Sequence, residues 1–407
     1  MTNPEFYNTL LAQAKNSSKM ESKMNPQTKR TPWVAMLLIL AASAFGDDDV
    51  CRPPQRKSFE QAKKLTKTQM SPAYNAPARI EVRGSWDLYL TGSFIFWQLS
   101  QDNMEIAFAD GLTNTAYIDA NQIKGNLVPM SFDYKPGFKV ALGINTDQDD
   151  WDALAEYTRI HASNSASTNG QTAIGTGTQL PLLPTWGHPY VMESNAYDTA
   201  SEKWNTNFDF IDIDLGRVYY VGTQLTFHPF FGARGAFITQ NVHVHYVNSI
   251  FSPGSASFPE TLGVMDIYKR LQSWAIGPRV GVNTNWMMGL GMRFFGNATA
   301  DVLYTKHKIQ DKTTFVATTT GLNEFFVSRD RPLNLRTHLD LEMGLGWGSY
   351  FDNNNWHIDL SAAYGFQVFF DQNMFSDYLN NGMPGHFIAP QGNLYAQGLT
   401  ATVRFDF

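Results

Sequence analysis

The chain has 407 residues and a formal net charge of −6; 14% of its residues are aromatic and only 17% are charged. A charged share below the usual ~25% excludes disorder for most of the chain, and the acidic balance gives no sign of a nucleic-acid partner. Because no run of about 18 apolar residues occurs, a bundle of transmembrane helices is excluded as well.

Residues 1–44 are predicted to be a secretory signal peptide. Lys29 and Arg30 precede a short apolar run over residues 33–42, and small residues follow it up to Ala44. A positive start, a short apolar centre and an A-x-A site form the pattern of such signals. We place cleavage after Ala44, with Gly46 as the second choice; a buried amphipathic helix is the alternative.

Residues 45–84 are predicted to form a periplasmic tail without a core of its own, because the segment carries four prolines and a basic stretch. Cys51 is the single cysteine of the chain, so an intramolecular disulfide is excluded. Asp48 and Asp49 stand just before it, where a lipidation site would carry small or apolar residues. A free thiol or an intermolecular disulfide is therefore the preferred reading of Cys51.

From Trp86 onward the apolar residues recur with a period of two, which is typical of β-strands. The clearest segment covers residues 333–349, where leucines, Met343 and Trp347 alternate with charged residues and glycines. A strand tilted by about 45° needs about 9–11 residues to cross a bilayer, and the clearest segments exceed that length. The predicted strands are 86–97, 136–146, 151–161, 204–215, 224–247, 271–283, 297–309, 333–349, 356–368 and 399–407.

These strands predict an all-β fold over residues 85–407: a transmembrane, antiparallel up-and-down β-barrel of the outer-membrane type. Connections that alternate between long and short support it, since such barrels have long outer loops and short periplasmic turns. The long connections are predicted at 98–135, 162–203, 248–270, 310–331 and 371–391, and the short ones at 147–150, 216–223, 284–296 and 351–355. Residues 104–109 look like a further strand, so an even number of about 10–14 strands is expected. A large soluble β-sandwich or jelly roll is the alternative.

The apolar face of each strand is predicted to contact lipid, and the polar face is predicted to line an aqueous pore. The residues predicted to face lipid are Leu339, Leu341, Leu345, Ile358, Leu360 and Val403. The residues predicted to line the pore are Arg234, Arg336, His338, Asp340, Glu342, His357, Asp359, Arg404 and Asp406. Aromatic residues near strand ends predict the girdles at the two membrane interfaces: Trp86, Trp97, Trp347, Trp356 and Phe407.

The segment 207–215 changes phase at Phe210-Ile211, which predicts a β-bulge. With that bulge, Asp209, Asp212 and Asp214 share the polar face and form an acidic cluster in the lumen. Three carboxylates at this spacing are also compatible with a Ca²⁺ site, but paired lumen charges are the preferred interpretation. This cluster favours a weak preference of the pore for cations.

No motif of a known catalytic or nucleotide-binding site is found: GxGxxG, the P-loop, GxSxG and HExxH are all absent from the sequence. His243 and His245 place two imidazoles on one strand face, an arrangement that can bind a metal. No third ligand is in view, so they are interpreted as lumen or loop histidines. We therefore predict no enzyme activity, no catalytic residues, no cofactor and no metal site.

Several stretches resemble the pore-forming, MOMP-like family of Legionella major outer membrane proteins and environmental chlamydiae. They are Gly92–Trp97, Gly137–Gly143 with Asp150-Trp151-Asp152 and Tyr157-Thr158, Asp212–Arg217, Leu225–Arg234 and Ile276–Gly281. Their order and spacing carry the resemblance, which extends over most of residues 86–407. It implies an outer-membrane barrel that conducts small hydrophilic solutes. Unlike the cysteine-rich chlamydial porins, this chain has one cysteine, which puts disulfide-linked assembly in doubt.

The ending Leu399–Phe407 resembles the C-terminal recognition signal of bacterial outer-membrane barrels, which implies the barrel-assembly machinery as a partner through Phe407. The function predicted is a porin of the bacterial outer membrane, embedded in lipid, that lets small hydrophilic solutes and ions diffuse through a water-filled barrel. The alternative is a structural or adhesive surface protein that displays long loops, and a secreted sandwich lectin is a third possibility. Whether the chain forms a homo-oligomer is left open.

Overall fold

The computed structural model describes residues 76–84, 86–109, 126–146, 149–172, 179–180, 182–186, 195–251, 263–317, 321–375 and 392–407. The predicted signal peptide, Cys51 and the first part of the predicted tail lie outside these residues. Within the described ranges no helix has the length and apolar character needed to cross a membrane.

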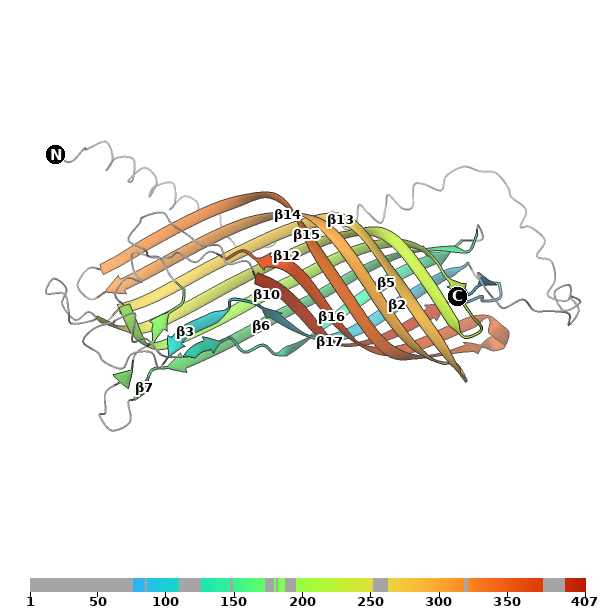
Figure 1. The fold of residues 1–407 in the computed structure, drawn as a ribbon, viewed down its shortest axis with the longest axis horizontal. Coiled ribbons are helices and arrows are strands. Elements are labelled where there is room, and N and C mark those ends of the chain that lie inside the picture. Colours follow the sequence, from blue (N-terminus) through green and yellow to red (C-terminus); the bar gives the residue numbers. More distant parts are fainter. Residues whose placement is uncertain are drawn as a thin grey trace, which may run out of the picture. The chain divides into compact units, whose positions relative to one another are not determined.

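Ten long antiparallel strands close into a barrel (Figure 1). They are β2 (Leu88–Gln101), β5 (Tyr134–Asn145), β6 (Trp151–Asn169), β10 (Asn195–Arg217), β12 (Leu225–Phe251), β13 (Gly263–Gly289), β14 (Met292–Ala317), β15 (Gly321–Phe351), β16 (Trp356–Asn373) and β17 (Gly392–Asp406). Each pairs with the next, and β17 pairs with β2 to complete the ring. The predicted outer-membrane type of barrel is thus confirmed, with ten strands at the lower end of the expected range.

The strands are longer than the sequence pattern indicated. Residues 310–331 and the first part of 162–203 were expected to be loops, but β14 extends to Ala317, β15 begins at Gly321 and β6 extends to Asn169. The short connection expected at 284–296 shrinks to residues 290–291. Gly289 at the end of β13 and Gly291 in the turn adopt positive φ angles of 97° and 79°. Glycine takes this conformation without the penalty that a Cβ atom brings.

The outer surface of the barrel changes character along the strands. Along each strand, the outward side chains next to the short turns are apolar or aromatic, and those farther from the turns are polar. The change occurs at the same height on neighbouring strands. The last apolar and first polar outward residues are Tyr157 and Arg159 on β6, Ile211 and Asp209 on β10, Phe237 and Thr239 on β12, Trp274 and Gln272 on β13, and Tyr304 and Lys306 on β14. Phe237 is the register partner of Trp274, and Thr239 of Gln272. We call this level the polarity boundary.

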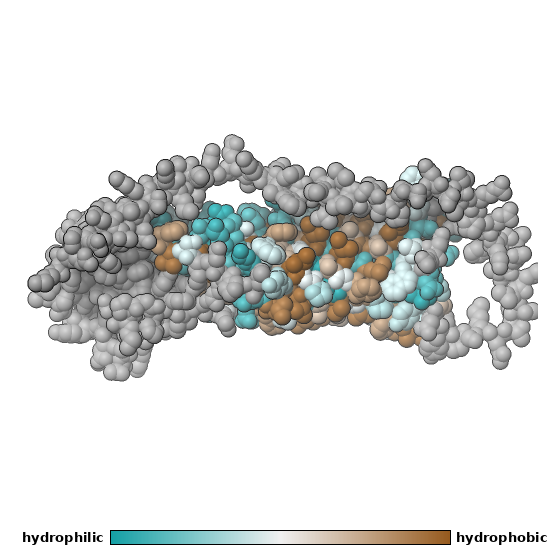
Figure 2. All heavy atoms as spheres, turned by 90° about the horizontal axis from the view of Figure 1, so that it is seen from above, coloured by the Kyte–Doolittle hydropathy of each residue, from teal (hydrophilic) through white to brown (hydrophobic). Residues whose placement is uncertain are grey.

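The polarity boundary separates two parts of the barrel. The membrane section runs from the short turns to the boundary, and only these parts of the strands span the membrane, because an apolar outer band is what lipid requires. The extension lies beyond the boundary, on the side of the long connections. Figure 2 shows the apolar residues as a brown band across the barrel, with hydrophilic residues gathered to its left.

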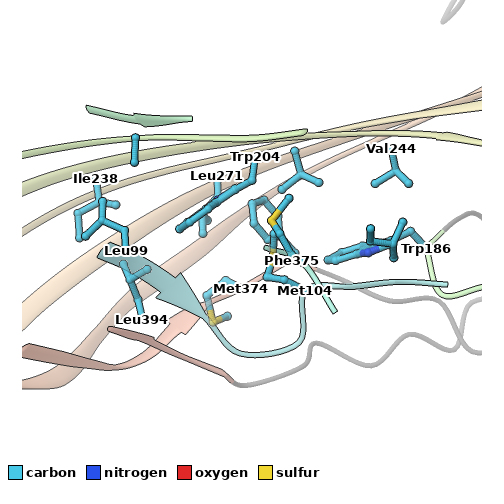
Figure 3. Packing of buried hydrophobic residues seen from close by; sticks show 14 of the residues in the cluster. Leu99, Met104, Trp186, Trp204, Ile238, Val244, Leu271, Met374, Phe375 and Leu394 are labelled. Carbon is cyan, nitrogen blue, oxygen red and sulfur yellow. The ribbon is translucent and has the colours of Figure 1, made fainter. Parts of the chain in front are cut away.

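The interior of the extension is filled by an apolar core. A three-stranded sheet of β4 (Asn126–Pro129), β3 (Glu105–Ala109) and β9 (Leu183–Pro184) lies inside, where the Tyr246 hydroxyl of β12 donates to the carbonyl of Ile106 at 2.5 Å. Trp186 and Phe375, from two different connections, pack edge to face in this core (Figure 3). The strand suspected at 104–109 therefore exists as β3, but it belongs to this inner sheet rather than to the barrel wall.

The end of the predicted tail is ordered against the periplasmic turns. β1 (Ala76–Pro77) pairs with β11 (Tyr219–Tyr220) in the turn between β10 and β12. Arg79 lies 3.3 Å from the carboxylate of Asp150 in the turn between β5 and β6. The Arg83 amide donates to the carbonyl of Asn354 in η1 (Asp352–Asn354), the turn between β15 and β16. Residues 76–84, the end of the predicted tail, thus join three turns.

Candidate functional site in the barrel lumen

A network of charged side chains crosses the lumen of the membrane section. Arg234 of β12 donates to both carboxylate oxygens of Asp212 on β10, at 2.6 and 2.7 Å, and to Asp301 of β14 at 2.8 Å. His338 of β15 places Nδ1 2.6 Å from Asp301 Oδ2 and 2.8 Å from the Arg234 guanidinium. Arg279 of β13 bonds Asp212 as well. We call these five side chains the central network.

The central network is almost fully enclosed by protein. The Asp301 and His338 side chains have 0% of their surface exposed, and Arg234 has 4%. Desolvated charges are tolerated when hydrogen bonds and opposite charges surround them. Each residue of the network points inward because strand side chains alternate, so five neighbouring strands contribute one side chain each at the same level.

Asp209 does not belong to this cluster, contrary to the prediction. β10 pairs with β6 and β12 without a register shift through residues 210–211, so the predicted bulge is absent. Asp212 and Asp214 point into the lumen, whereas Asp209 points outward and accepts a hydrogen bond from Tyr157 at 2.6 Å. The phase change in the sequence is the point where β10 crosses the polarity boundary and its polar residues move from the outer to the inner face.

A second group of paired charges lies closer to the periplasmic turns. Arg293 of β14 binds Asp359 of β16, with one contact at 2.7 Å. His357 places Nδ1 2.9 Å from Asp406 of β17, which also accepts from Arg404 at 2.9 and 2.6 Å. The four predicted residues of β16 and β17 therefore lie on the lumen side.

A third group is less enclosed. Lys139 of β5 lies 3.7 Å from Glu156 of β6, and the side chains expose 16% and 21% of their surface. On β15, Glu342 accepts from Asn297 at 2.9 Å and Asp340 accepts from Gln367 at 3.2 Å. The Asp340 and Glu342 carboxylates are half-buried, so this part of the lumen wall is less enclosed than the central network.

Arg336 lies farther from the periplasmic turns than the other predicted lumen residues. Its guanidinium donates to His307 Nε2 at 3.1 Å and to the carbonyl of Phe370 at 3.4 Å. It also lines a cavity of about 10 Å³ near the apolar core, which is room for about one water molecule. Arg336 therefore lies where charged and apolar fillings of the lumen meet.

Sequence reasoning missed several inward charges and placed one aromatic residue wrongly. The missed residues are Lys139, Asp152, Glu156, Arg279, Arg293 and Asp301. The period of two holds around each of these residues. Val280 on β13 and Val302 on β14 face outward, so strict alternation places the adjacent Arg279 and Asp301 inward. Trp97 was expected in an aromatic girdle, but it faces the lumen and donates to Thr400 at 3.2 Å.

His243 and His245 do not face the lumen. Both point outward from the extension, where they contact Asp266 of β13. The side chains predicted to contact lipid lie on the outer face as expected, and Leu341 exposes 57% of its surface.

A family model described as the Legionella pneumophila major outer membrane protein precursor matches residues 80–407. The chain belongs to this family. The match spans every barrel strand and shows an outer-membrane protein, which agrees with the apolar outer band of the membrane section.

No curated protein matches the chain at a significant level. Among solved structures, the outer membrane protease OmpT from Escherichia coli is 10% identical, with 80% of this chain and 98% of that chain covered and a TM-score of 0.38. A major outer membrane protein from Thermus thermophilus is 9% identical (78% and 99% covered, TM-score 0.24). A Pseudomonas aeruginosa FadL homologue is 10% identical (79% and 89% covered, TM-score 0.26).

Proposed function

We propose that this family member is a narrow outer-membrane pore for ions and small hydrophilic solutes, with the central network as its constriction. The observation that carries the proposal is the charged filling of the membrane section. Paired buried charges are no more stabilising than well-packed apolar residues of similar volume. The core of the extension of the same barrel is built mainly from apolar side chains, beside the buried Glu202 and Lys269. The denser charge of the membrane section is best explained by a need for a hydrophilic path.

The hydrogen bonding of the central network supports the same proposal. Among the described residues of the central network, His338 Nε2 and Asp301 Oδ1 have no hydrogen-bond partner although they are buried. Unpaired polar atoms are costly inside a protein and usually bind water. A lumen in which protein partners satisfy only part of the polar groups suits exchange with water and ions as the pairs rearrange.

A weak preference for cations is part of the proposal. Among the described residues, the inward carboxylates Asp212, Asp214 and Asp301 form ion pairs with two guanidinium groups, those of Arg234 and Arg279. Asp209, which points outward, contributes nothing to this balance. A reversal potential measured in a KCl gradient tests the preference, and an anionic sign would contradict it while leaving the pore proposal intact.

Planar-bilayer recordings of the purified protein, combined with cysteine labelling, test the pore. In a Cys51→Ser background, a bulky water-soluble thiol reagent is expected to lower the conductance of Glu342→Cys. Leu341→Cys is the matched control, because the neighbouring side chain points to lipid and its modification leaves conductance unchanged. Modification of Glu342→Cys without a change in conductance would contradict a path along this wall.

A structural or surface-display role is the second candidate, and the apolar core favours it. The core includes Trp186, Phe375 and Leu394, and it packs across the lumen of the extension (Figure 3). A barrel that serves only to hold loops at the cell surface gives no conductance steps, either in the unaltered protein or in a Phe375→Ala variant. A barrel that conducts gives larger or more frequent steps when Phe375→Ala loosens the core.

A further inference from the structure

The outer face of the extension brings three ligand-type side chains together. His243 and His245 lie two residues apart on β12, so both imidazoles point to the same side of the strand. Asp266 is the register partner of His245 on β13, and Tyr268 is the register partner of His243. The site lies beyond the polarity boundary, four residues past Thr239 on β12, which corresponds to about 13 Å along the strand.

The three ligand atoms are close enough for a single ion. His243 Nε2 lies 3.0 Å and His245 Nδ1 lies 2.7 Å from the same oxygen, Asp266 Oδ1. One ligand atom from each residue falls within 4.8 Å of the others. Zinc bonds of about 2.0–2.2 Å place tetrahedral ligands about 3.3–3.5 Å apart, so the carboxylate has to retreat by roughly half an ångström to admit the ion.

The surroundings hold these side chains in position. The Tyr268 ring stacks on the His243 imidazole with the centroids 4.3 Å apart and the planes 5° from parallel. Val244 and Ile267 are register partners between the ligand positions, and both side chains are fully buried in the apolar core. Ligands on packed strands are held more precisely than ligands on loops.

We propose that His243, His245 and Asp266 form a site for a divalent transition metal ion on the outer surface of the extension. Two imidazole nitrogens favour Zn²⁺, Cu²⁺ or Ni²⁺ over Ca²⁺ and Mg²⁺, which prefer oxygen ligands. The His243 and His245 side chains expose 41% and 39% of their surface, and Asp266 exposes 27%. The remaining coordination positions therefore face solvent, as in sites that exchange an external ligand.

Zinc titration of the full-length protein, folded in detergent and carrying no polyhistidine tag, tests the proposal. Competition with a chromophoric chelator measures the number of bound ions and their Kd. His243→Gln, His245→Gln and Asp266→Asn are each expected to raise the Kd of one site at least about tenfold, since even changes behind the ligands cost about 10–100-fold. Binding of Co²⁺ to the unaltered protein adds absorption bands that these variants lose.

His161→Gln is the matched control. His161 also points outward from a barrel strand, but it contacts the amide of Asn207. Among the described residues it belongs to no group of three metal-ligand side chains. This variant is expected to bind Zn²⁺ like the unaltered protein. Faster migration of unboiled than boiled samples shows that each variant is a folded barrel.

Two results would overturn the proposal: no Zn²⁺ bound by the unaltered protein below about 100 μM, or unchanged stoichiometry and Kd in the His245→Gln and Asp266→Asn variants. In either case, Asp266 serves only as a hydrogen-bond partner of the two imidazoles. The outcome is independent of conduction, because the site lies outside the lumen.

Discussion

On β10, Asp212 and Asp214 point into the lumen of the membrane section, whereas Trp204 and Phe208 point into the lumen of the extension. The outer face shows the reverse order: Ile213 lies in the membrane section and Lys203 in the extension. The strand conformation is continuous across the boundary. The solvent outside therefore decides which face is apolar, since lipid requires an apolar outer face and water favours an apolar interior.

The two regions also differ in what holds them together. The membrane section is bound across its interior by charge-assisted hydrogen bonds, which are directional and can exchange partners. The extension is bound by close packing of apolar side chains, which depends on shape and volume. Pairs of substitutions test this difference between the membrane section and the extension. Each pair compares the inner and outer faces of the barrel, or equivalent positions in the two regions.

The largest effect is expected from breaking the central network. Asp212→Ala leaves Arg234 and Arg279 without their shared carboxylate, and removal of one partner from a buried ion pair costs about 3–5 kcal/mol. Asp209→Ala, three residues away on the outer face, is expected to change the free energy of unfolding by less than about 1 kcal/mol. Urea unfolding of both variants in lipid vesicles measures the difference, and equal losses would show that the lumen charges are hydrated rather than enclosed.

A smaller effect is expected from a charge placed on the outer face of the membrane section. Leu341→Arg should cost about 2–4 kcal/mol if the site is near the bilayer midplane. Asn241→Arg places the same side chain outward in the extension, where water solvates it, and should cost less than about 0.5 kcal/mol. Equal stability of the two variants in lipid would contradict the polarity boundary.

The period of two located all ten barrel strands. In the membrane section, one face of each strand contacts lipid and the other faces the polar lumen, so apolar and polar residues alternate. It failed in the extension, where the faces exchange polarity and the apolar residues shift by one position. Asp209 was therefore placed on the lumen face with Asp212 and Asp214, and a bulge was introduced to bring them together. Residues 310–331 and Asp266 were assigned to loops for the same reason.

Contacts between distant strands lay beyond sequence reasoning. Lumen residues such as His338 and Asp406 were found from their alternation along one strand. Their partners depend on the register of other strands, as Arg234 with Asp301 illustrates across 67 positions. The third ligand beside His243 and His245 was missed because Asp266 is brought to them only by the pairing of β12 with β13.

Stability of the extension is expected to depend on pH through Glu202. This residue lies beyond the polarity boundary, and burial raises the pKa of its carboxyl from 4.5 to about 8, although Lys269 opposes the shift. Between these values the folded state binds a proton that the unfolded state releases, so stability falls as pH rises, by up to about 1.4 kcal/mol per pH unit. Urea midpoints at pH 5.5, 6.5 and 7.5 measure this slope.

Glu202→Gln removes the titrating group and should flatten that part of the pH dependence. Glu81→Gln is the control, because the Glu81 side chain is 70% exposed and lies near the periplasmic turns. If the pH profile of Glu202→Gln equals that of the unaltered protein, the Glu202 carboxyl is ionised in the folded extension and paired more strongly than its burial indicates.

The smallest expected difference compares one kind of hydrogen bond on the two faces. Tyr246 donates to the Ile106 carbonyl inside the extension, while Tyr157 donates to Asp209 on the outer face at the polarity boundary. Tyr246→Phe leaves a buried carbonyl unpaired and should cost about 1–3 kcal/mol. Tyr157→Phe leaves a carboxylate that Arg159, 3.8 Å away, and water can still contact, so the loss should stay below about 1 kcal/mol. Urea unfolding of the two variants measures both losses.

A larger loss for Tyr157→Phe than for Tyr246→Phe would mean that the outer face at the polarity boundary is as poorly hydrated as the apolar core. The edge of the lipid would then lie beyond Asp209, on the side of the extension.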